Sequence, residues 1–306
     1  MTATVAPPVE AAPKVRRKKS GAAEGGAGRA GWFVKGSIIL ICFLWIVPAI
    51  GIIVTSFRPT EDINDSGWWQ VFIHPAKYLT DLTTQNYSDA IHQANIGQGL
   101  LNSAAIALPA TFIPILIAAF AAYAFTFMRF PGRDVLFIII VSMLVVPNYV
   151  AFVPILKLYS TLHLAGHFPA AWLAHIGFGM SLAIFILRNY MATLPKEVIE
   201  SAKVDGASHF TTFWRLILPM SVPALAAFAI FQFLWTWNDL LVALVFIGPG
   251  DNQPVTIAVA NLLGQQGAGW QLVTAGGMLS MIIPIIVFMS MQRFFIRGLT
   301  AGSVKG

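Results

Sequence analysis

The sequence predicts an all-α protein that crosses a membrane six times. Of its 306 residues, 57% are hydrophobic and only 10% are charged, and the mean hydropathy is +0.73. Soluble domains carry about 25% charged residues. Six apolar runs also approach the roughly 20 residues that about 30 Å of hydrocarbon requires. The third observation is an uneven distribution of lysine and arginine, which predicts how the chain is oriented.

The first part of the chain, residues 1–34, is predicted to be a disordered, basic cytoplasmic tail. It is rich in Ala, Gly and Pro, contains the basic cluster Arg16–Lys19, and its apolar residues do not recur at the spacing of a helix or a strand. Arg16 and Arg17 could suggest a twin-arginine signal. The apolar run that follows is too long for a cleaved signal segment, so it favours a first transmembrane helix.

Residues 35–292 are predicted to form one six-helix membrane domain. The expected spans are Lys35–Phe57, Leu101–Phe127, Val135–Leu156, Ala170–Leu187, Val222–Ile247 and Leu272–Met291. Several contain proline, which membrane helices tolerate because neighbouring helices and water satisfy the freed carbonyls. These prolines, interpreted as packing kinks, are Pro48, Pro109, Pro114, Pro147, Pro154, Pro223 and Pro284.

The positive charges predict that both termini are cytoplasmic. With the N-terminus inside, sixteen of the 19 lysines and arginines fall in inner segments. The exceptions are Arg58, Lys77 and Lys157. This follows the positive-inside rule. The formal net charge of +6 is therefore interpreted as a topology signal and not as a nucleic-acid footprint.

The loop of residues 194–219, between the fourth and fifth spans, is unusually long and polar. Connections are a median of about 4–6 residues, and longer ones tend to be functional. Pro195 suits a helix start, and Gly206 can supply a left-handed stop. An apolar stretch then runs to Pro219. The pattern predicts a helix, a sharp turn and a second helix at the membrane surface.

The same loop resembles the EAA loop of ABC importer permeases, which reads roughly E-A-A-x3-G-x9-I-x-L-P. Two positions depart mildly, Ser201 and Leu216. In that family the loop docks on a separate ATP-hydrolysing subunit, so the resemblance implies ATPase-coupling residues here. The alternative is an ordinary amphipathic interfacial helix. The implied coupling residues are Glu200, Ser201, Ala202, Asp205, Gly206, Leu216, Leu218 and Pro219.

Shorter features resemble the carbohydrate branch of this family. They are Ser56-Phe57-Arg58, Asn86-Tyr87, Asn102-Ser103, the run Phe231–Leu241 and a C-terminal ending similar to that of the maltose-type permease. Residues 293–306 are predicted to be a cytoplasmic tail, within which Leu299–Gly306 is expected to help report closure of the ATPase pair, with a disordered terminus that has no role as the alternative. Its candidate residues are Leu299, Thr300, Gly302, Lys305 and Gly306.

The fifth span carries polar residues that are costly in a membrane. Such groups tend to face a bundle interior or a pathway. Trp235, Trp237, Asn238 and Asp239 are therefore candidates for the wall of a sugar pathway, with helix capping or an interchain hydrogen bond near the interface as the alternative.

Two other features are open to alternatives. Small residues over 118–124 and at Gly276-Gly277 predict close helix packing, within this chain or with a partner. Trp68 and Trp69 favour interfacial anchoring or the docking of an external protein about equally.

The resemblance implies a permease subunit of an ATP-driven carbohydrate importer in the bacterial inner membrane, which works by alternating access. The implied partners are a second, homologous permease, two ATP-binding subunits, an extracytoplasmic solute-binding protein, the sugar and membrane lipid. No cofactor is expected on this chain, whereas ATP and Mg are expected on the ATPase. Alternatives are a permease for another solute such as a glycerol phosphate, an ion-coupled transporter, or a polytopic membrane enzyme. The sequence does not identify the sugar.

Enzyme motifs carry little weight. Gly248–Asp251 matches GxGD, but aspartyl protease chemistry needs two carboxylates that share one site, and Asp251 has no obvious partner. His163 and His167 are spaced for a metal only if they are helical, and His92 and His175 are isolated. No G-x4-G-K-[ST] loop is present, so ATP hydrolysis by that route is not expected.

Overall fold

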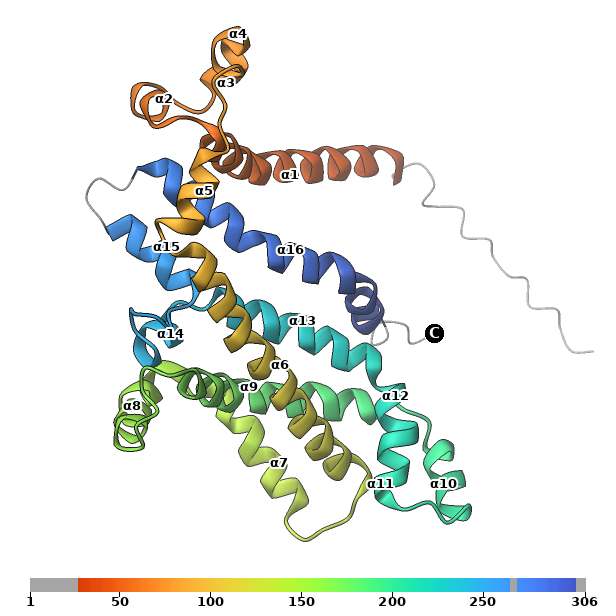
Figure 1. Ribbon diagram of the computed structural model, residues 1–306. Helices are drawn as coiled ribbons and strands as arrows, with labels where there is room; N and C mark the ends of the chain where they lie inside the picture. The colour runs from red at the N-terminus through yellow and green to blue at the C-terminus, as the bar shows by residue number, and fades with distance from the viewer. Residues whose placement is uncertain (1–26, 265–268, 301–306) are drawn as a thin grey trace, which may run out of the picture. The chain divides into compact units, whose positions relative to one another are not determined.

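The computed structural model describes residues 27–264 and 269–300, and all regular secondary structure within these ranges is helical (Figure 1). The predicted all-α fold class is therefore confirmed for the described residues. The chain divides into two compact units, residues 1–50 and residues 51–306. Four helices are long and apolar enough to cross a membrane, and two bent helix pairs raise the number of candidate spans to as many as six.

Helix α1 (Ala27–Phe57) begins earlier than the predicted start at Lys35. The predicted tail of residues 1–34 lies mostly outside the described residues, and its last part is helical. α1 has no acidic residue in its first turn and no basic residue in its last turn. A helix of this length with apolar residues on all sides is typical of a membrane span.

Four short helices follow α1 within the segment of residues 58–95. They are α2 (Thr60–Asp65), α3 (Gln70–Ile73), α4 (Pro75–Tyr78) and α5 (Gln85–His92). Arg58 holds this segment together: it is 1% exposed and donates hydrogen bonds to the carbonyl oxygens of Asp62 (2.6 Å) and Ser66 (3.0 Å). The Asn86 amide donates to the carbonyl oxygens of Ser56 and Arg58. Two of the short motifs that resemble the family, Ser56-Phe57-Arg58 and Asn86-Tyr87, thus supply the hydrogen bonds that hold this segment together.

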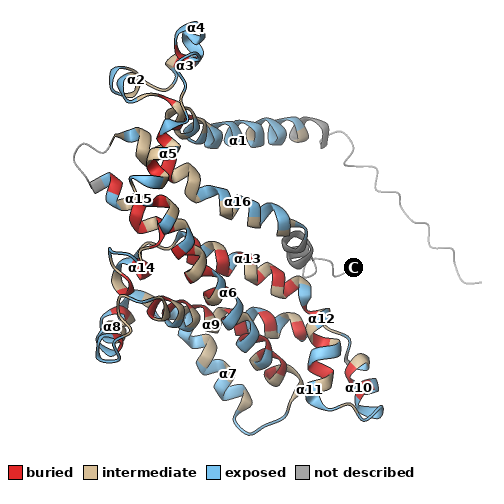
Figure 2. Cartoon of the chain, viewed as in Figure 1, coloured by how far each residue is buried: buried red, intermediate tan, exposed pale blue. Residues whose placement is uncertain are grey.

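The core lies among the long helices α6 (Ile96–Phe127), α9 (Phe168–Met191), α13 (Val222–Asn238) and α16 (Trp270–Thr300). Figure 2 shows the buried residues concentrated on α6, α9 and α13. Ala118, Ala119 and Ala122 are fully buried between α6 and its neighbours. The small-residue stretch therefore packs within this chain. Gly276 lies close to Ile96 and so packs within this chain, whereas no other atom of the described chain lies within 4 Å of the position that a Cβ at Gly277 would take.

The third predicted span is not one straight helix. α7 (Arg133–Ser142) and a short 3-10 turn (Met143–Val145) end at Pro147. A second 3-10 turn (Asn148–Ala151) then leads into α8 (Phe152–Thr161), at 95° to the first part. Val146 is extended because a residue before proline avoids the helical region. The sequence analysis interpreted Pro147 as a kink within one span, and the structure places a bend of 95° there between two separate helices.

The fifth predicted span is also shorter than expected. α13 ends at Asn238, Asp239 is extended, and a separate short helix α14 (Leu241–Phe246) follows. The carboxylate of Asp239 accepts a hydrogen bond from the backbone N–H of Val242 (2.6 Å). Aspartate side chains compete with the helix ladder in this way. The predicted end at Ile247 was therefore wrong.

One more helix, α15 (Val255–Gly264), lies between α14 and α16 and was not predicted. Asn102 and Ser103, a third short motif that resembles the family, hold the start of α15 in place. The Asn102 amide donates to the carbonyl oxygens of Asp251 (2.7 Å) and Gln253 (2.9 Å). The Ser103 hydroxyl accepts from the N–H of Val255 (2.9 Å). α16 then continues to Thr300, past the predicted start of the tail at residue 293.

Candidate functional site

The loop of residues 194–219 folds as helix, turn and helix, as the sequence predicted. Its first helix, α10 (Lys196–Val204), follows Pro195, which is the N-cap rather than the first helical residue. Ile199 and Ala202 are buried against the core, whereas Glu200 and Ser201 are exposed. On this nine-residue helix, one face therefore packs against the core and the other face is exposed.

The turn between the two helices depends on Gly206. Its φ is +73°, a conformation that L-residues resist, so the predicted left-handed angle is confirmed. A Cβ at Gly206 would meet no atom within 4 Å. The requirement for glycine therefore comes from the backbone angle alone. Asp205, just before it, is exposed and ends α10.

The second half of the loop contains α11 (His209–Thr212), a π-helical turn (Phe213–Ile217) and α12 (Leu218–Met220). Ser208 caps α11, since its hydroxyl accepts from the N–H of Thr211 (3.2 Å). Pro219 has no N–H to donate to the preceding turn, which favours a break there. The loop and α13 meet at a bend of 71°.

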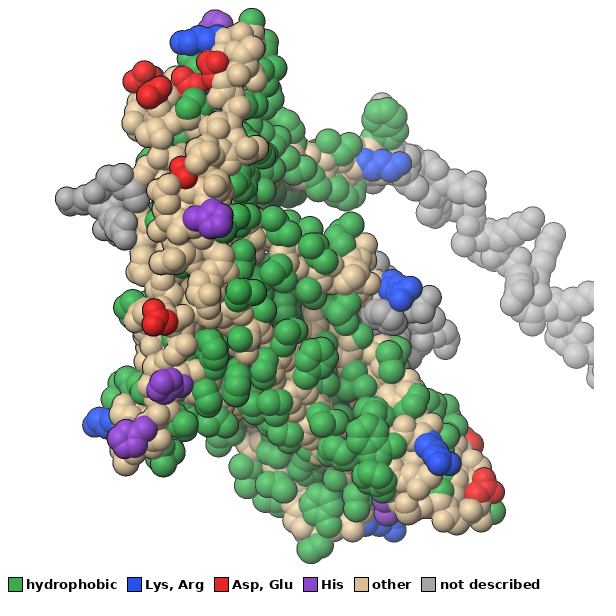
Figure 3. Space-filling view, viewed as in Figure 1, with side chains coloured by type: hydrophobic (Ala, Val, Ile, Leu, Met, Phe, Trp, Pro, Cys, Tyr) green, Lys and Arg blue, Asp and Glu red, His purple; other side chains and the backbone are tan. Residues whose placement is uncertain are grey.

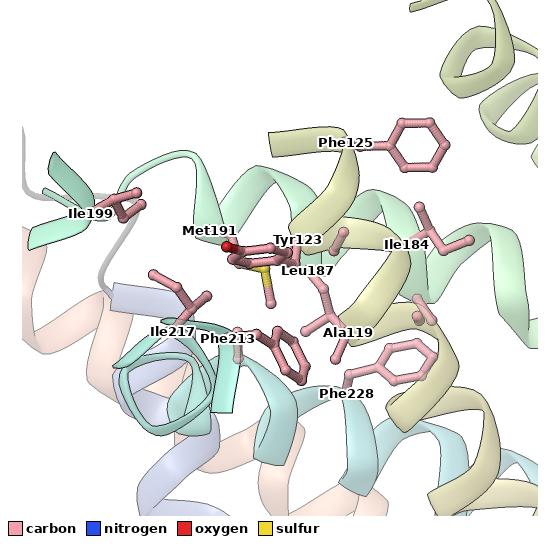
Figure 4. Close-up of a cluster of buried hydrophobic side chains, with 14 residues drawn as sticks. Ala119, Tyr123, Phe125, Ile184, Leu187, Met191, Ile199, Phe213, Ile217 and Phe228 are labelled. Carbon is pink, nitrogen blue, oxygen red and sulfur yellow. The ribbon is translucent and has the colours of Figure 1, made fainter. Parts of the chain in front are cut away.

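This second half is fixed to the spans. Phe213 and Ile217 are fully buried in the cluster that joins α6, α9 and α13 (Figure 4). Phe213 stacks on Phe120 with ring centroids 4.4 Å apart. The hydroxyl of Tyr123 on α6 lies 3.0 Å from Nδ1 of His209. The second half of the loop is therefore packed directly against α6. Leu216 and Leu218 are half-buried, and Pro219 is exposed.

The loop also presents large apolar side chains to its surroundings. Val204 is 87% exposed and Phe210 is 68% exposed, on either side of the Gly206 turn. Trp214 is exposed as well and contacts Phe210 ring edge to face. Charged side chains gather beside α10 in Figure 3, while hydrophobic side chains cover the middle of that face. An apolar, charge-rimmed projection of this kind is typical of a protein interaction site.

A second candidate site is a polar recess beside the bend between α7 and α8. Its lining comes from the bend, α9, α13 and the start of α14: Asn148, Tyr149, Phe152, His175, Phe178, Gly179, Gln232, Trp235, Asp239 and Val242. Aromatic rings and hydrogen-bonding groups thus occur together around a space of about 30 Å³, which is room for water and not for a sugar in this conformation.

Gln232 is the most unusual group in this recess. It is 3% exposed, and its amide nitrogen donates to the carbonyl oxygens of Ala110 (3.2 Å) and His175 (3.4 Å). Its amide oxygen is buried and has no hydrogen-bond partner among the described residues. A Cβ at Gly179 would lie 2.7 Å from this oxygen, so any larger residue there requires the Gln232 amide to shift. The sequence analysis missed Gln232, although a glutamine within a span is itself a signal.

The four predicted pathway residues do not lie together. Trp235 and Asp239 line the recess. Trp237 is 2% exposed in a different cluster, and its indole N–H donates to the carbonyl oxygen of Ser280 on α16 (3.0 Å). Asn238 is exposed and its amide bonds back to Leu234 (2.7 Å). Trp237 therefore joins helices, and in this structure its ring is not exposed to a pathway.

The fold and the loop geometry have counterparts among known proteins. Residues 92–301 match the family described as binding-protein-dependent transport system inner membrane component. The chain belongs to this family. The match covers both candidate sites and every helix from α6 to α16. This confirms the predicted class of multi-pass inner-membrane transport component, which is not an enzyme.

Two curated relatives of this transport family member share about half of its residues. The osmoprotective compounds uptake permease protein GgtD of Synechocystis is 52% identical over 88% of this chain and 90% of its own length. The alpha-glucoside transport system permease protein AglG of Rhizobium meliloti is 54% identical over 73% of this chain and 60% of its own length.

A solved structure supports the fold of this family member. It is a bacterial ABC transporter involved in the import of the acidic polysaccharide alginate, and one of its chains matches with a TM-score of 0.70. The match covers 88% of this chain and 98% of that chain at 18% identity. At this identity the likeness concerns the fold alone.

The remaining candidates are the C-terminal residues and the histidines, of which His175 lines the recess. Leu299 and Thr300 end α16, whereas Gly302, Lys305 and Gly306 lie outside the described residues. His163 and His167 lie between α8 and α9 and not on a helix, so they lack the geometry that their spacing suggested.

Proposed function

We propose that this chain is the permease subunit of an ATP-driven sugar importer and forms half of its translocation pathway. The family assignment and the fold support the transport role. The name of the Rhizobium meliloti relative supports an α-glucoside as substrate, and that of the Synechocystis relative an osmoprotective compound. A permease for a glycerol phosphate is less well supported, because neither name points to one.

The proposed membrane arrangement has six spans and both termini in the cytoplasm. The bent pair of α7 and α8 supplies the third span, and α13, with the bent loop before it, supplies the fifth. The uneven distribution of lysine and arginine supports this orientation, because cytoplasmic segments are enriched in them. The loop of residues 194–219 is then cytoplasmic, and the outer segment, residues 58–95, faces the opposite side.

In this arrangement the loop couples the spans to a separate ATPase. Val204, Phe210 and Trp214 offer the apolar contact surface, and Glu200 lies on the free face of α10. Two ATP-binding subunits hold ATP and Mg, and their closure displaces the loop as a rigid body. Phe213 transmits the displacement to α6, so that the pathway opens alternately to each side.

The polar recess contributes the pathway surface of this chain. The carboxylate of Asp239 can accept hydrogen bonds from sugar hydroxyls, and the buried, unpaired oxygen of Gln232 becomes available to them when the recess opens. Trp235 supplies an aromatic ring on the same wall. A second, homologous permease completes the pathway, and an extracytoplasmic solute-binding protein delivers the sugar. The family description supports the last partner.

The single observation that carries the proposal is the family match over residues 92–301, with an exposed apolar loop at a defined turn inside it. The test is reconstitution of the chain in proteoliposomes with its second permease, ATPase and binding protein. ATP-dependent uptake of a radiolabelled α-glucoside is expected. Uptake of none of a panel of α-glucosides and related osmoprotective glycosides, by a complex that hydrolyses ATP, would contradict the sugar assignment.

A matched pair of variants tests the coupling surface. Phe210→Ala removes an exposed side chain, so the fold should persist while the ATPase copurifies poorly and uptake falls. Leu82→Ala removes an exposed apolar side chain from the outer segment and serves as the control. Equal copurification of the ATPase with the two variants would exclude Phe210 from the contact surface.

A further inference from the structure

A cationic groove lies where α6 and α9 end and α7 begins, beside α10. It is distinct from the polar recess and from the apolar surface of the loop. Its lining combines apolar side chains with four cations and one carboxylate: Phe125, Thr126, Phe127, Met128, Arg129, Arg133, Arg188, Ala192, Leu194, Ile199, Glu200 and Lys203. Four cations against one carboxylate give the groove a positive field.

Arg188, near the end of α9, carries an unsatisfied donor in this groove. Its guanidinium lies over the ring of Phe137, 4.9 Å from the centroid, and one terminal nitrogen donates to the amide oxygen of Asn189 (3.3 Å). Its Nε is buried and has no hydrogen-bond partner among the described residues. A buried donor on a charged group is costly to leave unpaired, so this atom indicates a missing acceptor.

The other cations leave the groove open to an anion. Arg133 pairs with the exposed Asp134, with an Nε–Oδ1 distance of 2.9 Å, and its Nη1 donates to the carbonyl oxygen of Met128. Within the described ranges, no other cation of the groove has a carboxylate within 4.0 Å. Arg129 and Lys203 are exposed. Most of the positive charge of the groove is therefore not neutralised by the part of the chain that the structure describes.

An apolar face runs from the groove along α7. Val135, Leu136, Ile138 and Ile139 are exposed on this helix, which Figure 2 shows as largely uncovered. Since α7 is part of a candidate membrane span, acyl chains cover such a face in a bilayer. A phosphate site at the end of a span, continuous with an acyl-facing helix, has the two surfaces that a phospholipid requires.

We propose that this groove binds the phosphate of an anionic phospholipid headgroup, whose acyl chains lie along α7. Arg188 and Arg133 supply planar donors to the phosphate oxygens, and Arg129 and Lys203 add attraction. Basic pockets between membrane helices are known to bind such headgroups. The lipid then links α10 to the ends of α6 and α9. A soluble phosphate lacks the acyl chains that the α7 face would hold.

The test uses the purified full-length chain, delipidated in detergent, and native mass spectrometry with added phosphatidylglycerol or phosphatidylcholine. We expect preferential retention of phosphatidylglycerol. Arg188→Gln should weaken that retention about fivefold, as expected for the loss of one cation near a phosphate. Arg215→Gln removes the same charge from the loop of residues 194–219, outside the groove, and should retain the lipid as the unaltered chain does.

Two further arms separate a folding defect and a soluble ligand from lipid binding. If Arg188→Gln does not fold, the exposed Arg129→Gln replaces it and should show the same weakening. Inorganic phosphate and glycerol phosphate, added at the lipid concentration, should not displace phosphatidylglycerol. Displacement would assign the groove to a soluble phosphate and overturn the lipid. Equal retention of both lipids would also overturn the proposal of a phospholipid site. The same holds if the variants change only the copurification of the ATPase.

Discussion

Replacing Gly206 tests whether the loop must hold one backbone conformation to couple ATP hydrolysis to transport. Its φ of +73° costs an L-residue about 1–2 kcal/mol. No neighbouring atom lies within 4 Å of the position that a Cβ would take, so a clash does not add to this cost. The adjoining α10 has nine residues and, among its described side chains, buries only Ile199 and Ala202. A helix of this length is only marginally stable by itself, so α10 does not compensate for a strained backbone at residue 206.

The expected effect follows from this strain. A cost of about 1–2 kcal/mol lowers the ratio of native to non-native turn about 5- to 30-fold, which sets the upper limit of the loss. Gly206→Val should therefore reduce uptake and ATPase stimulation by that order in proteoliposomes, with membrane insertion unchanged. Gly206→Asn is the matched control, because asparagine adopts the left-handed region more readily, and it should retain most of the activity. Wild-type activity of the valine variant would refute the reasoning. Equal losses in both variants would show that side-chain bulk, and not the backbone angle, decides.

Three further predictions concern other parts of the chain. Asp239→Ser keeps an acceptor for Val242 and should preserve the complex while changing the apparent affinity for the sugar; dissociation of this complex would make the group structural. Trp237→Phe loses one buried hydrogen bond, so the free energy of unfolding of the chain should fall by about 0.5–1.5 kcal/mol while the affinity for the sugar stays unchanged. An altered affinity would show that Trp237 belongs to the pathway. Deleting residues 300–306 should uncouple ATP hydrolysis from uptake without affecting insertion, and a truncated complex that matches the full-length one in both assays would exclude this role.

Local chemistry explains the features of the loop that were predicted correctly. Gly206 is the residue that most readily adopts a positive angle, so its place after an amphipathic stretch indicated the turn. The capping Ser208 was missed, although a serine before a new helix is a local signal of the same kind. The depth of Phe213 was not predictable, because it depends on which side chains of α6 and α9 surround it.

The sequence by itself determined the membrane class, the helical fold, the loop and its turn, because hydropathy, charge placement and glycine geometry act over short distances. Only the tertiary structure decided that Trp237 joins α13 to α16 while Trp235, two residues earlier, lines the recess. It also decided that Gln232 and Gly179 meet, and that four distant cations share one groove. These facts depend on how α6, α9 and α13 pack. Hydropathy indicates that a helix is apolar, but the side chains of its neighbours decide which face each residue occupies.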